Sequence, residues 1–170
     1  ADIMELGGLG RRFDLIECGG VLHHLEDPLS GWRVLLDLLR PGGLMKIALY
    51  SETARRCVAL GRELIATKGY TATAEDIRRC RQDILAAAAD GNPDMMKLIY
   101  FNDFYSLSEC RDLLFHAQEH RFTIPQIEAA LRDLGLKFLG FELTDPRTKA
   151  QFKKESHCLL YTSPRHRDRG

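Results

Sequence analysis

Two stretches, FDLIECGGVLHHLEDP at residues 13–28 and LLRPGGL at residues 38–44, determine the fold that the sequence predicts. The first opens with a short apolar run that ends at a pair of glycines, as buried strands of parallel sheets do. Asp27 is a suitable N-cap for the following helix, and Pro28 is a suitable first residue. Residues 44–50 form a second apolar run. Two strands joined by one helix predict a parallel βαβ unit, which is normally right-handed.

Outside these stretches, the pattern changes twice. Residues 52–120 are rich in helix signals, including capping boxes that begin at Thr73, with Asp76, and at Ser106, with Glu109. After them a helix capped by Thr123, with Gln126 at N3 and Gly135 just past its end, and a strand at 137–143 restore the alternation of strands and helices. The sequence therefore predicts an α/β fold that carries an all-helical insertion. Within the insertion we expect helices at 52–67, from 73 to the stop at 91–93, at 94–101, and from 106 onward.

The composition excludes several classes of protein. Among 170 residues, 24 lysines and arginines balance 24 acidic residues, so the chain has no general attraction for nucleic acid or for anionic membranes. Its apolar runs are too short to span a membrane, and no targeting segment is recognisable, so we expect a cytoplasmic protein. The five cysteines form no metal or redox motif and are expected to be reduced and buried. His116 and His120 have helical spacing without the glutamate of a zinc motif, so no metal site is predicted.

Ligands of open α/β sheets bind beyond the carboxyl ends of the strands. This rule directs attention to residues 19–26, to residues 50–55 and to the segment from 144 onward. The first two segments contain an adjacent histidine pair, His23 and His24, and an aromatic residue, Tyr50. We expect the functional residues of the chain to lie there.

The pairing of FDLI with VLHHLEDP, followed by LLRPGGL, resembles the fourth-strand and fifth-strand motifs of class I S-adenosylmethionine-dependent methyltransferases. The resemblance covers residues 1 to about 143. A looser likeness, YSLSECRDLLFHAQEH at 105–120, is to bacterial methyltransferases joined to tetratricopeptide repeats. The resemblance implies the C-terminal part of a Rossmann-like methyltransferase sheet, with S-adenosylmethionine as the cofactor and an unidentified small molecule or protein as the methyl acceptor.

The resemblance also implies cofactor-binding residues. Asp2, followed by Ile3, matches the position where an acidic residue accepts a hydrogen bond from the adenine amino group. Gly19, Gly20 and Val21 match the strand end beneath the methionine part of the cofactor, where small residues allow the backbone to approach closely.

The chain departs from that family in two features. It lacks the glycine-rich loop after the first strand and the acidic residue after the second strand. We therefore expect residues 1–156 to be a partial methyltransferase domain, inactive alone, whose insertion occupies about 52–120. We expect residues 157–170 to be a frayed tail or non-native sequence. An incomplete sheet would expose apolar faces, so we also expect self-association.

The candidate chemical roles remain alternatives. His23 or His24 is suited to act as a general base, since imidazole titrates near neutrality, or both simply pack over the cofactor. Tyr50, Asp103 and Tyr105 line an acceptor pocket, or the aromatic residues of this region hold the helices together. Phe101 and Phe104 are expected in the core. Surface positions are expected for Arg55 and Arg56, and a solvated or ion-paired helix face for Arg111, Asp112 and Glu119.

Two functions other than methyl transfer are compatible with the sequence. One is a non-catalytic methyltransferase-like module that binds a partner protein through its helical insertion. The other is a nicotinamide-dependent oxidoreductase, which is disfavoured because no Tyr-x-x-x-Lys pattern is present.

Overall fold

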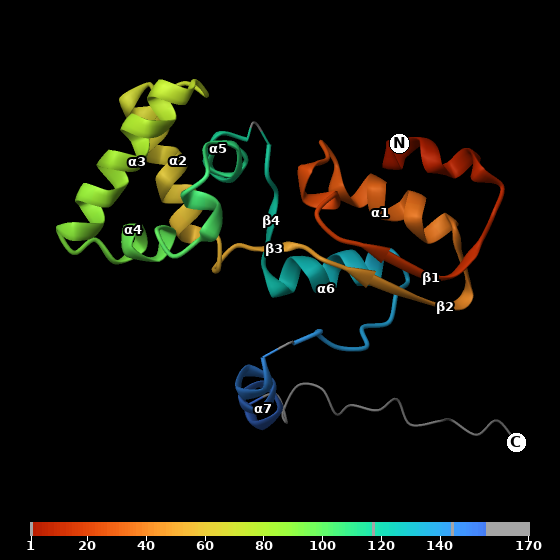
Figure 1. Ribbon diagram of the computed structural model, residues 1–170. Coiled ribbons are helices and arrows are strands. Elements are labelled where there is room, and N and C mark those ends of the chain that lie inside the picture. The colour runs from red at the N-terminus through yellow and green to blue at the C-terminus, as the bar shows by residue number, and fades with distance from the viewer. Residues whose placement is uncertain (1, 117, 144, 156–170) are drawn as a thin grey trace, which may run out of the picture. The chain divides into compact units, whose positions relative to one another are not determined.

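The computed structural model describes residues 2–116, 118–143 and 145–155. It divides into two compact units, Ala1–Leu136 and Lys137–Gly170. The first unit contains a βαβ unit, a block of helices and one further helix, so the protein is mixed α/β and mostly helical (Figure 1). In the part of the chain that is described, no helix is long and apolar enough to span a membrane.

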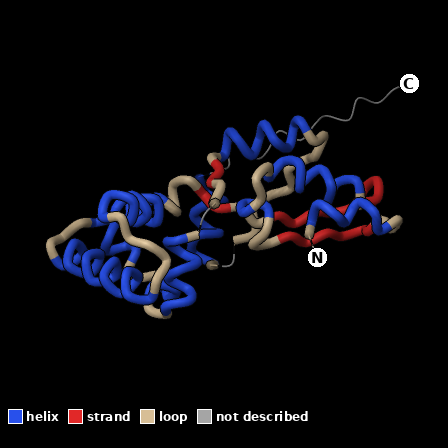
Figure 2. The backbone as a smooth tube through the Cα atoms, turned by 90° about the horizontal axis from the view of Figure 1, so that it is seen from above, coloured by secondary structure: helices blue, strands red, loops and turns tan. Residues whose placement is uncertain are grey.

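The predicted βαβ unit is present. Strand β1 (Phe13–Cys18) is followed by helix α1 (Pro28–Asp37) and by strand β2 (Leu39–Ile47). The two strands pair in parallel, as Figure 2 shows by their side-by-side course. Asp27 caps α1 by accepting a hydrogen bond at 3.0 Å from the backbone N–H of Leu29, and Pro28 occupies the first turn. The order of strand, helix and strand and the helix cap, both predicted from the sequence, are therefore confirmed.

The second strand differs from its predicted bounds at both ends. It begins at Leu39, so the turn expected at 40–43, before the strand, is a bulge within the strand. The register shows the bulge: Phe13 pairs with Leu39, but Leu15, only two residues later, pairs with Leu44. Gly42 supplies a φ of +80°, and a Cβ on Gly43 would lie 3.0 Å from the carbonyl oxygens of Asp14 and Arg40. The strand also ends before Tyr50, which lies in the short strand β3 (Tyr50–Ser51), paired in parallel with β4 (Arg121–Phe122). The sequence analysis missed β4.

Only one face of the β1–β2 pair is covered. Ile16 and Cys18 of β1 and Met45 and Ile47 of β2 belong to a hydrophobic cluster with residues of α1. On the opposite face Leu15 is 64% exposed, so the expectation of a fully buried strand was wrong. A parallel sheet is buried on both faces only when each face has its own layer of helices, and the described residues provide one such layer. The cluster has its fully buried centre at Leu22 and includes Ile3, Trp32, Leu35 and Ala130.

Four α-helices and a short 3-10 helix make up the helical block, defined here as residues 56–115. They share one hydrophobic cluster, in which Val58, Ile84 and Phe104 have no exposed surface. The predicted core position of Phe104 is confirmed, and Phe101 packs against the same cluster. The elements are α2 (Arg56–Lys68), α3 (Ala74–Ala89), α4 (Pro93–Leu98), η3 (Asn102–Phe104) and α5 (Leu107–Phe115).

The starts of these helices follow the predicted caps with several corrections. Helix α4, predicted at 94–101, begins at Pro93 and ends at Leu98, and Ser106 caps α5 only by accepting from the N–H of Glu109, without the reciprocal bond of a capping box. Helix α2 begins at Arg56 and not at 52, because the N–H of Glu52 is bonded to the carbonyl of Phe122 beside the β3–β4 pair. Thr73 caps α3 as expected, but Asp76 does not complete the capping box; its carboxylate accepts hydrogen bonds from Thr71 instead. Helix α5 is shorter than expected and ends at Phe115, since His116 is already in extended conformation.

Helix α6 (Ile124–Asp133) follows β4 and has the signals that were predicted for it. Thr123 and Gln126 form a complete capping box. At the other end Gly135 has a φ of +66°, and the N–H of Leu136 donates at 2.8 Å to the carbonyl of Leu131, which is a Schellman motif.

In the second unit, the strand predicted at 137–143 is absent: the residues are irregular, and Leu139 is 72% exposed. A strand requires a hydrogen-bonded neighbouring strand, and among the described residues the strands pair as β1 with β2 and β3 with β4. Helix α7 (Pro146–Glu155) follows. Phe141 contacts Phe138 at 4.9 Å and Phe152 at 5.7 Å between ring centres, which gives this unit a small aromatic cluster. The expected tail, 157–170, lies outside the described residues.

Candidate functional site

The first strand of the βαβ unit delivers the histidine pair to the carboxyl end of the sheet. After Cys18 the chain passes through Gly19 and Gly20, which has a φ of +74°, into the 3-10 helix η2 (Leu22–His24). Leu22 is fully buried and anchors this turn in the hydrophobic cluster. The carbonyl of His23 accepts a hydrogen bond at 2.7 Å from the N–H of His120, which ties η2 to the segment before β4.

His23 is stacked on Tyr50. The centres of the two rings lie 3.7 Å apart, with 28° between their planes. The guanidinium carbon of Arg55 lies over the same tyrosine ring, 4.0 Å from its centre. The predicted association of the histidine pair with Tyr50 is therefore present, and it brings together the ends of β1 and of the strand segment that follows β2.

The environment of His23 keeps its imidazole neutral. It is 1% exposed, and within the described part of the chain neither ring nitrogen has a hydrogen-bond partner. Burial lowers the pKa of His23 to about 4, aided by the nearby His24 and Arg55, while Glu119 and the backbone of Ala48 act in the opposite direction. A base with so low a pKa accepts protons poorly near neutral pH.

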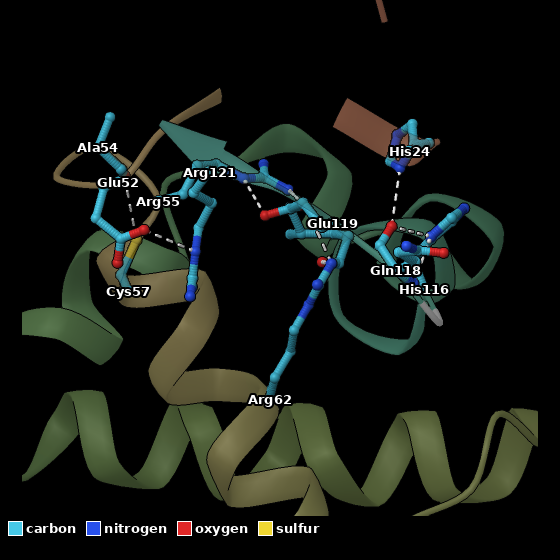
Figure 3. Close-up of polar contacts among 11 residues, drawn as sticks. His24, Glu52, Ala54, Arg55, Cys57, Arg62, His116, Gln118, Glu119 and Arg121 are labelled. Atoms are coloured by element: carbon cyan, nitrogen blue, oxygen red, sulfur yellow. Dashed lines mark hydrogen bonds and ion pairs between the residues drawn. The ribbon is translucent and has the colours of Figure 1, made fainter. Parts of the chain in front are cut away.

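His24 has a different environment. Its Nδ1 atom lies 3.1 Å from the carbonyl oxygen of Gln118, and its ring centre is 4.3 Å from that of His116 (Figure 3). A carbonyl oxygen only accepts, so Nδ1 of His24 carries the hydrogen. The lone pair of the neutral ring is then on Nε2. Of the two histidines, His24 is the one suited to accept a proton.

A buried group of ions lies beside the stack. The side chain of Glu119 is 1% exposed and accepts hydrogen bonds from Nε and a terminal nitrogen of Arg55. Arg62 reaches the same carboxylate at 3.1 Å (Figure 3). Burial raises the pKa of Glu119, but the hydrogen bond from Arg55 and the charges of Arg55, Arg62 and Arg121 outweigh it and hold that pKa below its usual value.

Arg55 and Glu119 are functional candidates whose surroundings differ from those expected: Arg55 is buried instead of exposed, and Glu119 is ion-paired, as one alternative had it, but its side chain is buried. Arg55 is 9% exposed, and Glu119 lies outside any helix, between α5 and β4. The available signal for Arg55 was its place in the segment directly after a strand. For Glu119 no such signal existed, because its burial depends on Arg62 and Arg55. These arginines precede it in the chain by 57 and 64 positions.

The residues expected at the adenine end of the cofactor lie in and beside the 3-10 helix η1 (Ile3–Leu9). Asp2 is exposed and caps this helix by accepting a hydrogen bond at 2.9 Å from the N–H of Met4. Ile3 is 8% exposed and belongs to the same hydrophobic cluster as Leu22. Val21, expected at the strand end, is 39% exposed and precedes η2 directly.

Asp103 and Tyr105 are not brought to the histidines. Both lie in or next to η3 of the helical block, where Tyr105 is 56% exposed and contacts Phe104 at 5.3 Å. Among the described residues, no hydrogen bond, ion pair or ring contact joins either of them to His23, His24 or Tyr50. The reason is that the buried Phe104 fixes η3 within the block's own core.

The other described histidines and cysteines form no metal-binding arrangement. His116 and His120 do not share a helix, so their helical spacing in the sequence was misleading. The described residues contain no group of three or more potential metal ligands. Four cysteines, Cys18, Cys57, Cys80 and Cys110, are buried free thiols as expected, and burial raises the pKa of Cys80 to about 12. Cys158 lies outside the described residues.

A pocket of about 460 Å³ adjoins this region. It is lined by the residues that begin α1, by His120 to Phe122, and by one side of α6. Its acidic residues are Glu26, Asp27 and Asp133, of which Asp27 is already engaged as the cap of α1. No residue predicted from the sequence as a site residue lines it.

Comparison with known proteins finds a distant relative of this chain. No family model matches the chain. An uncharacterized protein of Synechococcus sp. (strain ATCC 27144 / PCC 6301 / SAUG 1402/1) is 32% identical over 157 residues, which cover 85% of this chain. The chain spans 35% of the length of that relative.

Proposed function

We propose that the protein takes part in S-adenosylmethionine-dependent methyl transfer to an acceptor that is not yet identified. One observation carries the proposal: a parallel βαβ unit whose first strand ends in Gly19 and Gly20 and passes directly to the histidine pair, with Tyr50 stacked on His23. In this proposal β1 and β2 belong to a Rossmann-like methyltransferase sheet, and the helical block is an insertion in it.

Two features of the structure are compatible with the cofactor. At Gly20 nothing lies within 4 Å of the place where a Cβ would project, so the backbone there is open to close approach. Asp2 uses one carboxylate oxygen to cap η1, and its exposed side chain has a second oxygen for an exocyclic amine. In the proposal Asp2 and Ile3 hold the adenine, and Gly19, Gly20 and Val21 hold the methionine part.

The cofactor would supply the electrophilic methyl group, so the demands on the protein are small. Its residues align the acceptor and exclude water, which the burial of His23 against Tyr50 favours. His24 is the proposed base for an acceptor that must lose a proton, since its Nδ1 donates to Gln118 and its Nε2 has no hydrogen bond to any described residue. Tyr50 would line the acceptor side, and Asp103 and Tyr105 would do so only if the helical block moved.

Binding of S-adenosylhomocysteine tests the proposal directly. Isothermal titration of the full-length polypeptide encoded by the gene should show binding that is lost in Asp2→Ala and Gly20→Trp. Gly91→Trp is a matched control, because Gly91 also has a positive φ, +90°, with nothing within 4 Å of its Cβ position, but lies in the helical block's surface. Absence of binding to the unaltered polypeptide at saturating ligand contradicts the proposal.

Sequencing the coding DNA upstream of Ala1 provides a second test. The methyltransferase proposal expects a strand, a Gly-x-Gly-type loop and an acidic residue about 20 positions later. A stop codon or unrelated sequence would instead favour a non-catalytic module.

That second candidate, a module that binds a partner protein, is favoured by one observation. The helical block exposes large apolar and aromatic side chains: Tyr100 is 81% exposed, Tyr105 56% and Met96 43%. If this function is correct, Tyr100→Ala abolishes partner binding in the cell, whereas Asp2→Ala and Gly20→Trp leave it unchanged.

A further inference from the structure

Tyr50 is enclosed on both faces. The imidazole of His23 is 3.7 Å and the guanidinium carbon of Arg55 is 4.0 Å from the centre of the same ring. Two flat groups this close to one ring centre would collide if they shared a face, so they occupy opposite faces. The result is a three-layer stack in the order His23, Tyr50, Arg55.

The outer layer of the stack is itself fixed. Arg55 donates to both oxygens of Glu119 through Nε and a terminal nitrogen, which is the fork geometry that restricts a guanidinium most strongly. Glu119 is nearly inaccessible to solvent and is held from a second side by Arg62 of α2. A cation over an aromatic face adds attraction to the contact with Tyr50.

We propose that Arg55 and Glu119 are positioning residues of the candidate site: Glu119 holds Arg55, Arg55 holds the ring of Tyr50, and Tyr50 closes off His23, which leaves His24 as the imidazole available to an acceptor. The proposal rests on the proposed function for its last step only. The stack itself requires neither a cofactor nor a reaction, so it is measurable separately.

The stack has an electrostatic consequence that reports on its integrity. The groups facing His23 are His24 on its own turn, Tyr50 and Arg55 from the β3 segment, and Glu119. Burial and the charge of Arg55 both lower the pKa of His23 to about 4. Removing Arg55 releases Tyr50, admits water to His23 and removes a positive charge. Each of these three changes raises the pKa of His23.

The experiment is an NMR titration of the histidine ring protons in this chain and in Arg55→Met. The pKa of His23 should rise from about 4 toward the ordinary 6.5 in the variant, and the ring-current shift caused by Tyr50 should be lost. Arg56→Met is the matched control, because the neighbouring Arg56 is 73% exposed in its side chain and should leave both signals unchanged. Unchanged His23 signals in folded Arg55→Met would overturn the proposal.

Further variants keep the test decisive if Arg55→Met does not fold. Arg55→Lys keeps the positive charge but cannot donate two hydrogen bonds to the carboxylate in the geometry of a guanidinium. The pKa of His23 and its ring-current shift in this variant should lie between those of the unaltered chain and of Arg55→Met. Tyr50→Phe keeps the ring and should behave as the unaltered chain, whereas Tyr50→Leu should free His23 as Arg55→Met does. Added to Arg55→Met, Glu119→Gln should produce no further change in the ring-current shift of His23, because Glu119 fixes the stack through Arg55. Its direct effect on the pKa of His23 is separate: loss of the nearby carboxylate charge should lower that pKa. A further change in the ring-current shift contradicts the proposed order.

Failure of this proposal and failure of the proposed function give different results. If the full-length polypeptide binds no S-adenosylhomocysteine while Arg55→Met still raises the pKa of His23, the methyl-transfer proposal is wrong. The proposal that Arg55 and Glu119 position the stack then still holds. Once a methyl acceptor is found, Arg55→Met should lower kcat/KM by roughly 10²-fold through misplacement of the site, with Arg55→Lys partly rescuing it. A pH–rate profile governed by His23 instead of His24 would contradict the assignment.

Discussion

The helical block and the βαβ unit bury apolar side chains in different ways. In the helical block, α2 to α5 surround a common core, so residues such as Val58 and Phe104 are enclosed from all sides. In the βαβ unit, helices cover one face of the β1–β2 pair, and Leu15 and Leu44 remain largely exposed on the other. The comparison teaches that local amphipathicity is sufficient for a self-contained helical core, whereas a parallel sheet depends on layers from elsewhere.

The largest expected effect concerns the core of the helical block. Phe104→Ala removes a fully buried ring and should lower the free energy of unfolding by about 4 kcal/mol. Urea titration followed by far-UV circular dichroism measures this loss, and Tyr105→Ala, next to it and 56% exposed, is the control that should change little.

The same titration also compares the two regions. Trp32 is the single tryptophan of the chain and lies in the cluster of the βαβ unit, so its fluorescence reports that region alone. We expect Phe104→Ala to shift the dichroism midpoint more than the fluorescence midpoint. Coincident shifts would mean that the two cores unfold as one.

The next effect is the pH dependence contributed by His23. Its pKa is about 4 in the folded chain against an ordinary 6.5, so the unfolded chain binds more protons between these values. The contribution of neutral His23 to the free energy of unfolding is therefore fully present above pH 6.5 and is lost as the pH falls through about 4. The loss amounts to roughly 3 kcal/mol, at 1.36 kcal/mol per pKa unit.

His23→Leu should remove this acid loss, because leucine does not titrate. Unfolding curves at several pH values between 7 and 4 test it, with His24→Leu as the control that keeps most of the loss, because burial lowers the pKa of His23 more than the charge of His24 does. An identical pH dependence in His23→Leu and the unaltered chain would show that His23 is not the responsible group.

A smaller effect is expected on self-association through the open face of the β1–β2 pair. We expect the chain to associate, and the double variant Leu15→Lys with Leu44→Lys to weaken association about tenfold, since burial of two half-exposed leucines is worth about 1.5 kcal/mol. Sedimentation velocity over a concentration series measures the change. Leu85→Lys, at a 41% exposed site of the helical block, should have no effect, and a monomeric unaltered chain would refute the expectation.

The smallest effects concern the helix caps. Thr73→Ala at α3 and Thr123→Ala at α6 should each cost about 1 kcal/mol, with the larger loss at Thr123, whose capping box is complete. Thr67→Ala, at an exposed position near the end of α2, is the control. Equal losses at the two caps would show that the reciprocal bond of Gln126 contributes nothing.

The parts of the fold that were predictable are those determined within a few residues. Asp27 with Pro28, and Thr123 with Gln126 and Gly135, specify helix ends by local hydrogen bonding, and the structure has all of them. The strand expected at 137–143 failed because a strand also depends on a partner. The bulge at 40–43 was missed because it depends on a close approach to the carbonyl of Asp14 in another strand.

The same distinction applies to the candidate site. The rule about strand ends identified His23, His24 and Tyr50, which the structure brings together. It did not identify Glu119 or the burial of Arg55, because a carboxylate enclosed by two arginines depends on two distant segments of the chain meeting. Asp103 and Tyr105 were selected for their place at the junction of two inserted helices, and the helical block places them elsewhere.

The hydrogen bond from the N–H of His120 to the carbonyl of His23 makes the η2 turn a favourable position for directed evolution. Every amino acid supplies a carbonyl at position 23, and every one except proline supplies an N–H at position 120. A library that randomises positions 23 and 24 would thus exchange side-chain chemistry while retaining the main-chain anchor of the turn. New reactivity could be selected there without redesigning the backbone that presents it.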